Sequence, residues 1–500
     1  SCKYGRKELW KLHYGNVPEL SEPWVEGYNS LICDWNFRCI YHYERYRYNY
    51  KKRKRGKEVM KKRVVLVLMA AMLVVGVTAC GSKDAGKKEE AKTEQKATGE
   101  IGTVSIDDLN TTDTQVIDIR EEEQYIGWET EDGKGGHIKG AIDFPKSWLD
   151  MDIENDAAIG TTMENEIERR GLDLDKATVL YSNQDVSEED AQKYQKLGFK
   201  NISVLEGGYD AYVEAGKETD QLKHYEMYVY PQWVQDLVDG KKPETYNGGD
   251  YKICEVSLKE PSEEYEQGHI PGAYYVNTNT MNHIPGPRAV ADYENIPLEE
   301  QYKIWNRPKD ADIQKNLEEA GITKDTTVIL YGTTAATTAA ARTAAILKYA
   351  GVEDIRILNG GKTLWTLQGR ELEKGNNEPQ KVSFGATVPV NPDVFYDYDE
   401  EMDVVNDKNS VVASIRSWDE YLGKISGYTY IGEAGDIANS RFGYAGSDPY
   451  SMEDYRNVDN TMFNYNMMAD RWKLWGIAPD KRVSFHCGTG WRASETYFYA

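Results

Sequence analysis

Short apolar runs alternate with longer polar stretches from about residue 103 onward, and one such pattern recurs three times. Each copy starts at a glycine, passes through a polar turn and ends in an apolar run; the copies span 171–182, 321–332 and 476–487. A short apolar run predicts a buried strand, and a glycine before a polar turn is typical of a helix end. The copies start 150 and 155 residues apart, which indicates repeated domains rather than a solenoid.

The segments that follow the first two apolar runs repeat as well. Helix-forming residues 187–197 and 337–349 each precede a glycine, and apolar runs at 202–205 and 355–358 then lead into Gly-Gly turns. Strands that alternate with helices predict α/β domains, in which helices cover both faces of a parallel, doubly wound sheet.

Three further marks complete the pattern. Residues 116–120 end in Asp-Ile-Arg, residues 411–416 end in Ser-Ile-Arg, and a His-Ile-x-Gly-Ala turn stands at 137–141 and again at 269–273. Together with the repeated segments that end in an apolar strand and with the Gly-Gly turns, these motifs resemble those of the rhodanese family. The resemblance covers about 103–500 and implies three tandem rhodanese-like domains, which we expect at 103–223, 224–378 and 386–500.

The third copy is shorter than the first two. It stops at Ala500, inside the expected helix, before the strand and Gly-Gly turn that close the other copies. We therefore expect the third domain to be truncated at its C-terminus, with the missing part containing a Gly-Gly-x3-aromatic close.

The third copy alone ends its apolar run in a cysteine. In the rhodanese family, which this segment resembles, the corresponding cysteine accepts a sulfane sulfur as a persulfide. A thiolate there is stabilised by inward-pointing backbone N–H groups and by the dipole of the helix that follows. The loop reads Cys487-Gly488-Thr489-Gly490-Trp491-Arg492.

Each residue type in this loop suits that chemistry. Gly488 and Gly490 are expected to curl the loop through positive φ, and Thr489 and Ser494 offer hydroxyl groups, with Ser494 a candidate helix cap. Arg492 supplies a cation for an anionic sulfur donor. The Cys-x4-Arg spacing is one residue shorter than that of the rhodanese-like phosphatases and arsenate reductases. This spacing favours sulfur transfer over phosphate-ester hydrolysis. The resemblance implies a sulfurtransferase that moves sulfur from thiosulfate or a similar donor to cyanide or a thiol. A non-enzymatic persulfide carrier or partner-binding lipoprotein is the alternative.

The first two copies lack the nucleophile. Ser182 and Gly332 stand at the cysteine position, and a serine without a partner base is a poor nucleophile. We expect both domains to be inactive scaffold or regulatory copies. Cys254 lies at strand spacing without a glycine loop, which predicts a packed core thiol. Arg416 and Arg441 are candidates for an anion pocket, and solvated surface charge is the alternative for both.

Charge is unevenly distributed along the chain. The net charge is -23, but residues 1–63 carry +9 and the remainder −32. The strongly negative charge of residues 64–500 argues against nucleic-acid binding. No cluster of residues has metal-ligand spacing, and we expect no cofactor.

Residues 60–80 resemble a bacterial lipoprotein signal peptide. Met60-Lys-Lys-Arg precedes the apolar run 64–77, and the lipobox-like end places Cys80 as the lipidated residue. An uncleaved signal anchor is the alternative, although the run is shorter than the ~20 residues that span a bilayer. We expect 81–102 to be a flexible tether and the protein to be extracytoplasmic and anchored to the membrane by lipid. Residues 1–59 would then be translated leader, or else a small basic cytoplasmic domain.

Overall fold

The computed structural model describes residues 100–151, 161–257, 263–278, 297–332, 337–429 and 431–500, which all fall in one compact unit, Gln95–Ala500. The predictions for the leader 1–59, the signal peptide 60–80 with Cys80, and most of the tether lie outside these residues. The tether was predicted to reach residue 102, but the first strand already begins there.

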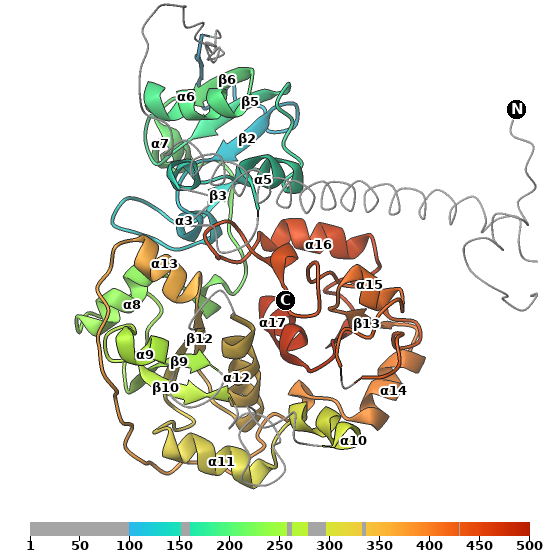
Figure 1. Cartoon of the computed structure of the whole chain (residues 1–500). Helices are drawn as coiled ribbons and strands as arrows, with labels where there is room; N and C mark the ends of the chain where they lie inside the picture. Colours follow the sequence, from blue (N-terminus) through green and yellow to red (C-terminus); the bar gives the residue numbers. More distant parts are fainter. Residues whose placement is uncertain (1–99, 152–160, 258–262, 279–296, 333–336, 430) are drawn as a thin grey trace, which may run out of the picture. The chain divides into compact units, whose positions relative to one another are not determined.

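Domain 1 contains a parallel five-stranded sheet (Figure 1) in the order β1-β6-β5-β2-β4. Its strands are β1 (Gly102–Val104), β2 (Gln115–Asp118), β4 (Ile142–Asp143), β5 (Ala177–Tyr181) and β6 (Asn201–Leu205). A separate antiparallel pair joins β3 (His137–Ile138) to β7 (Thr219–Asp220). The α-helices are α3 (Glu122–Ile126), α5 (Met163–Arg169), α6 (Glu188–Leu197) and α7 (Gly208–Glu214).

Domain 2 repeats this sheet, in the order β10-β9-β11-β12-β8, with every pair parallel. The strands are β8 (Tyr228–Val229), β9 (Tyr251–Ser257), β10 (Tyr274–Asn277), β11 (Thr327–Gly332) and β12 (Ile355–Leu358). The α-helices are α8 (Pro231–Val238), α9 (Glu263–Gln267), α10 (Leu298–Gln301), α11 (Asp310–Glu319), α12 (Thr337–Ala350) and α13 (Gly361–Leu367).

Domain 3 has a three-stranded parallel sheet within the described residues, in the order β14-β13-β15. The strands are β13 (Ser410–Ser414), β14 (Arg441–Phe442) and β15 (Arg482–His486). The α-helices are α14 (Tyr398–Asn406), α15 (Trp418–Tyr421), α16 (Tyr465–Lys473) and α17 (Trp491–Tyr499).

The three recurring apolar runs form equivalent strands, which confirms the predicted α/β architecture. β5, β11 and β15 pair in parallel with β2, β9 and β13, respectively. Ser182 and Cys487 directly follow their strands, and Gly332 is the last residue of its strand.

The segment that leads from domain 2 into domain 3 packs on domain 2. Phe384 and Val388 are buried in the same hydrophobic core as Val328 and Leu330 of β11. The segment predicted to start domain 3 at residue 386 therefore still packs on domain 2, because its apolar side chains complete that core. The first helix of domain 3 is α14.

Domain 3 contacts both other domains. Helix α17 packs against α12 of domain 2, and Phe498 joins the core of that domain (Figure 1). On the domain 1 side, Arg170 donates a hydrogen bond to Asn457 (2.8 Å) and Trp148 donates one to Asp459 (2.8 Å). These contacts are buried, so the Cys487 domain is held on both sides. Among the described residues, we find no helix with the length and apolar character needed to span a membrane.

Candidate active site

Cys487 lies between the end of β15 and the N-terminus of α17. Its thiol is free and partly exposed. The backbone N–H of Gly490 donates a hydrogen bond to Cys487 Sγ at 3.1 Å, and Gly490 is the N-cap of α17 at φ 82°. The sulfur therefore receives a backbone donor at the positive end of a helix dipole, which favours the thiolate or persulfide anion.

The structure corrects the predicted helix cap. Helix α17 begins at Trp491, and Ser494 is not its cap: Ser494 Oγ donates to the Gly490 carbonyl oxygen at 2.6 Å. Gly490, in the left-handed conformation, takes the cap position because a glycine adopts it without strain.

Gly488 is needed for space and not for positive φ. A Cβ on Gly488 would fall 1.9 Å from a ring carbon of Tyr428, so the aromatic ring lies directly against the loop backbone. The Tyr428 hydroxyl donates to the Pro449 carbonyl oxygen (3.2 Å) and accepts from Arg492 (3.1 Å). Burial raises the pKa of Tyr428, and the nearby negative charge of Cys487 raises it further, so its hydroxyl stays protonated.

Arg492 is held by a carboxylate that sequence reasoning missed. Its two terminal nitrogens donate to the two oxygens of Glu420, at 3.1 and 2.9 Å. Burial works against the charged forms of both groups, but the ion pair prevails: the pKa of Glu420 is lowered and that of Arg492 is raised. The cation predicted to face an anionic donor is therefore already neutralised inside the protein. The local signal was the capping box Ser417–Glu420, which marks an ordinary helix start.

The two candidate anion-pocket arginines lie in different surroundings. Arg416 is buried and donates to the carbonyl oxygens of Gly435 (2.6 Å) and Ser426 (3.1 Å) and to Glu420 (3.3 Å). It braces the chain between α15 and β14. Arg441 is exposed on β14, which β13 separates from the cysteine-bearing β15. The exposure of Arg441 favours the solvated-surface alternative.

Domain 2 contributes side chains to the cysteine loop. Trp305 packs edge-on against Trp491, with ring centroids 6.0 Å apart. Arg342 of α12 approaches Gly490, since a Cβ on that glycine would lie 3.3 Å from Arg342 Nη1. Thr489 is half-buried. The repeats in the sequence do not predict this contribution, because it arises from contacts between domains.

The equivalent positions in the other domains carry no nucleophile. In domain 1, the Ser182 carbonyl oxygen accepts the N–H of Tyr209. Arg120, which is buried and paired with Asp118, donates to the side-chain oxygen of the next residue, Asn183. In domain 2, Gly332 ends β11, and residues 333–336 lie outside the described part of the chain. Both copies lack a sulfur nucleophile at this position, as predicted.

Cys254 is a core residue, as predicted. It lies in β9 with 1% exposure, and burial raises the pKa of its thiol to about 12. It stays a protonated thiol at neutral pH. A search of the described residues finds no group of three His, Cys, Asp or Glu side chains that is placed to hold a metal ion.

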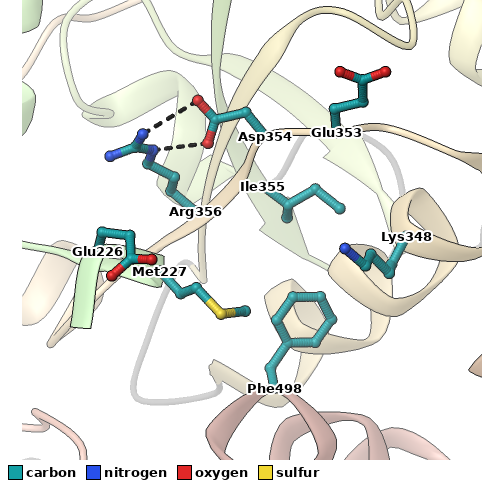
Figure 2. Close-up of a pocket in the computed structure, with 8 residues that line it drawn as sticks. All are labelled: Glu226, Met227, Lys348, Glu353, Asp354, Ile355, Arg356 and Phe498. Carbon is teal, nitrogen blue, oxygen red and sulfur yellow. Dashed lines mark hydrogen bonds and ion pairs between the residues drawn. The ribbon is translucent and has the colours of Figure 1, made fainter. Parts of the chain in front are cut away.

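One cavity of about 180 Å³ lies where Phe498 of α17 meets β12. Figure 2 shows Arg356 paired with Asp354 on one side of it and Lys348 on another. No residue of the Cys487 loop lines this cavity, so it is separate from the candidate active site.

Comparison with known proteins places these features in a family. The family model for the rhodanese-like domain matches residues 105–215 and 231–368. The thiosulfate sulfurtransferase YnjE of Escherichia coli is 38% identical over 400 residues, which are 79% of this chain and 84% of that protein. A putative thiosulfate sulfurtransferase of Mycolicibacterium smegmatis is 28% identical over 49% of this chain and 81% of its own length.

Solved structures give the same result. The anaerobic ergothioneine biosynthesis enzyme from Chlorobium limicola, in complex with trimethyl histidine, superposes with a TM-score of 0.71 at 33% identity. The match covers 80% of this chain and 92% of that chain. EanB, solved with a cysteine persulfide and ergothioneine, gives the same values. The tyrosine, the persulfide cysteine and the threonine altered in EanB follow one another at the same separations as Tyr428, Cys487 and Thr489 here.

Proposed function

Because this chain belongs to the rhodanese-like domain family and is a sulfurtransferase, we propose that it moves a sulfane sulfur from thiosulfate, or a similar anionic donor, to cyanide or a thiol through a persulfide at Cys487. The observation that carries this proposal is the hydrogen bond from the Gly490 N–H to Cys487 Sγ at the start of α17. It stabilises negative charge on Sγ in the thiolate, which attacks the donor and is released again when the persulfide gives up its outer sulfur.

The reaction has two displacements. The Cys487 thiolate attacks the outer sulfur of thiosulfate, a new S–S bond forms, and sulfite leaves with the electron pair of the old S–S bond. The acceptor then attacks the terminal sulfur of the persulfide, and the Cys487 thiolate is released. Cyanide becomes thiocyanate and a thiolate becomes a persulfide. No external oxidant or reductant is needed.

The loop dimensions support sulfur transfer over phosphate-ester hydrolysis. The Cys-x4-Arg ring is one residue shorter than the phosphatase-type ring, and Arg492 is fixed by Glu420 and Tyr428. A guanidinium that already forms a two-point ion pair has fewer free donors for a tetrahedral oxyanion. A sulfane sulfur needs less space and fewer donors.

Thiocyanate formation by the full chain with thiosulfate and cyanide tests this function. We expect turnover in the wild type and in Cys254→Ser, and none in Cys487→Ser. Undiminished thiocyanate formation in Cys487→Ser would contradict the proposal. If the Cys487 persulfide forms but does not transfer its sulfur to cyanide or to a thiol, the non-enzymatic carrier is favoured.

A second acceptor class is supported by a specific observation. Tyr428, Cys487 and Thr489 share their separations with the residues altered in EanB, and the Tyr428 ring lies on the loop. With a trimethylated histidine, the terminal sulfur of the persulfide would bond to a ring carbon. The proton from that carbon would end on the Cys487 sulfur as the S–S bond breaks.

Persulfidated protein incubated with trimethyl histidine separates the two acceptors. Ergothioneine, detected by mass spectrometry, would identify the imidazole as an acceptor. Tyr428→Phe should then lower ergothioneine formation more than it lowers thiocyanate formation. If ergothioneine is absent while thiocyanate forms, the cyanide or thiol acceptor stands and the imidazole acceptor is excluded.

We also propose that the protein is anchored by lipid on Cys80 at the outer face of a bacterial membrane, from the signal-like residues 60–80. Metabolic labelling with palmitate in a bacterial host tests this. The label should follow the wild type into the membrane fraction and be lost in Cys80→Ala; wild-type protein without label would contradict the anchor.

A further inference from the structure

Arg342 belongs to domain 2 but lies against the active-site loop of domain 3. It is on α12, the helix that packs on α17, and the residue is only 3% exposed. A Cβ on Gly490 would be 3.3 Å from Arg342 Nη1, and the N–H of this same Gly490 donates to Cys487 Sγ. The guanidinium group is therefore adjacent to the residue that holds the reactive sulfur.

The charge of Arg342 is not balanced by a carboxylate among the described residues. Its Nη2 donates to the Trp305 carbonyl oxygen at 3.2 Å, its guanidinium faces the Phe395 ring at 5.1 Å, and its Nε has no hydrogen-bond partner in the described part of the chain. Arg492 differs in this respect, because Glu420 pairs with it directly. Arg342 is thus the cation near the loop whose field is not cancelled locally.

A buried cation without a counter-ion is energetically costly. Burial lowers the pKa of Arg342 to about 10, the nearby Arg307 lowers it too, and the negative charge of Cys487 acts in the opposite direction. The group remains charged at neutral pH. The anion that can offset this cost is the sulfur of Cys487, since opposite charges attract more strongly away from water.

We propose that domain 2, although it lacks a nucleophile, completes the Cys487 site by supplying Arg342 as the uncompensated cation that stabilises the Cys487 thiolate and persulfide. The inference rests on the proposed persulfide function and deepens it. Arg342 acts here as a positioning residue, through the electrostatic field at the sulfur, and domain 2 is part of the working site rather than an inert copy.

Alkylation of Cys487 by iodoacetamide across pH tests this in the full chain, because only the thiolate reacts. An opposite charge near a titrating group shifts its titration by about one unit or more. We therefore expect Arg342→Met to react about tenfold more slowly at neutral pH, with the midpoint of its pH profile moved upward. Arg342→Lys keeps the charge and should recover most of the rate.

Arg356→Met is the matched control. Arg356 is also a buried arginine of domain 2, but Asp354 pairs with it, and none of its hydrogen-bond or ion-pair partners is a loop residue. Its substitution should leave the alkylation profile of Cys487 unchanged. If Arg342→Met does not fold, Arg342→Gln, which retains a donor for the Trp305 carbonyl, carries the same expectation.

Two results would overturn the inference. One is a wild-type alkylation profile in the Arg342 variants that lack the charge; the other is an equal loss of rate in Arg356→Met, which would indicate disturbed packing of domain 2. Alkylation does not require sulfur transfer. A wild type that forms no persulfide with thiosulfate would thus refute the proposed function, while the alkylation profiles would still decide the role of Arg342.

Discussion

Replacing Glu420 by glutamine tests how the active-site arginine is held. Glu420 is fully buried and accepts from Arg492 through both oxygens and from Arg416 through one. It also accepts from the backbone N–H and the hydroxyl of Ser417 at the start of α15. One carboxylate therefore compensates two buried guanidinium groups and caps a helix.

The cost of this substitution follows from those contacts. A glutamine retains one acceptor oxygen, so about two charge-assisted hydrogen bonds are lost, each worth roughly 1.5–3 kcal/mol. Removal of one partner from a buried ion pair costs about 3–5 kcal/mol. We expect Glu420→Gln to lower the local free energy of opening by about 3–5 kcal/mol, and to lower turnover because Arg492 is no longer fixed.

Native-state hydrogen exchange, read by mass spectrometry over α15 and residues 487–492, measures this opening free energy. Asp419→Asn is the control, because it is the same chemical change on the same helix. Asp419 pairs with Lys424 at the surface, and an exposed pair is worth at most about 1 kcal/mol. Equal protection of α15 and the loop in both variants would refute the idea that Glu420 holds the site together.

Three further predictions follow from the same contacts. Gly488→Ala should abolish turnover and destabilise the loop by about 1–3 kcal/mol, since its Cβ would meet the Tyr428 ring; activity near wild type would contradict this packing. Cys254 should resist alkylation until the protein is unfolded in urea, since it is buried with a raised pKa; its labelling in folded protein would contradict its core position. The lowered pKa of Glu420 should stabilise the fold above its ordinary pKa of 4.5, and this stability is lost as pH falls below 4.5 through the lower folded-state pKa. The free energy of unfolding, measured by urea denaturation, should therefore fall more steeply in acid for the wild type than for Glu420→Gln. Parallel pH dependences of the two proteins would contradict this role of Glu420.

The architecture was largely predictable from the sequence because its elements are local. A central strand of a parallel sheet is buried on both faces and appears as a short apolar run in the sequence. The apolar runs that end the three repeats therefore identified β5, β11 and β15. The cysteine loop was also visible, since its residues are consecutive. The packing of Phe384 and Val388 on the core of domain 2 was not visible in the sequence, because it is a tertiary contact.

The surroundings of the loop were not predictable in this way. Tyr428, Glu420 and Arg342 are far from Cys487 in sequence, and each reaches the loop from a different element. The sequence left two alternatives open for Arg441, because it does not reveal which strand of the sheet this residue occupies. The site is thus a local loop completed by long-range contacts, and only its local part can be recognised in a single sequence.

Mass spectrometry of the peptide that contains Cys487, after incubation of the full chain with thiosulfate under non-reducing conditions, tests the central claim most directly. The account predicts a mass increase of one sulfur atom on Cys487, which is removed by cyanide and absent in Cys487→Ser. An unmodified Cys487 in protein that nevertheless converts thiosulfate and cyanide to thiocyanate would contradict it.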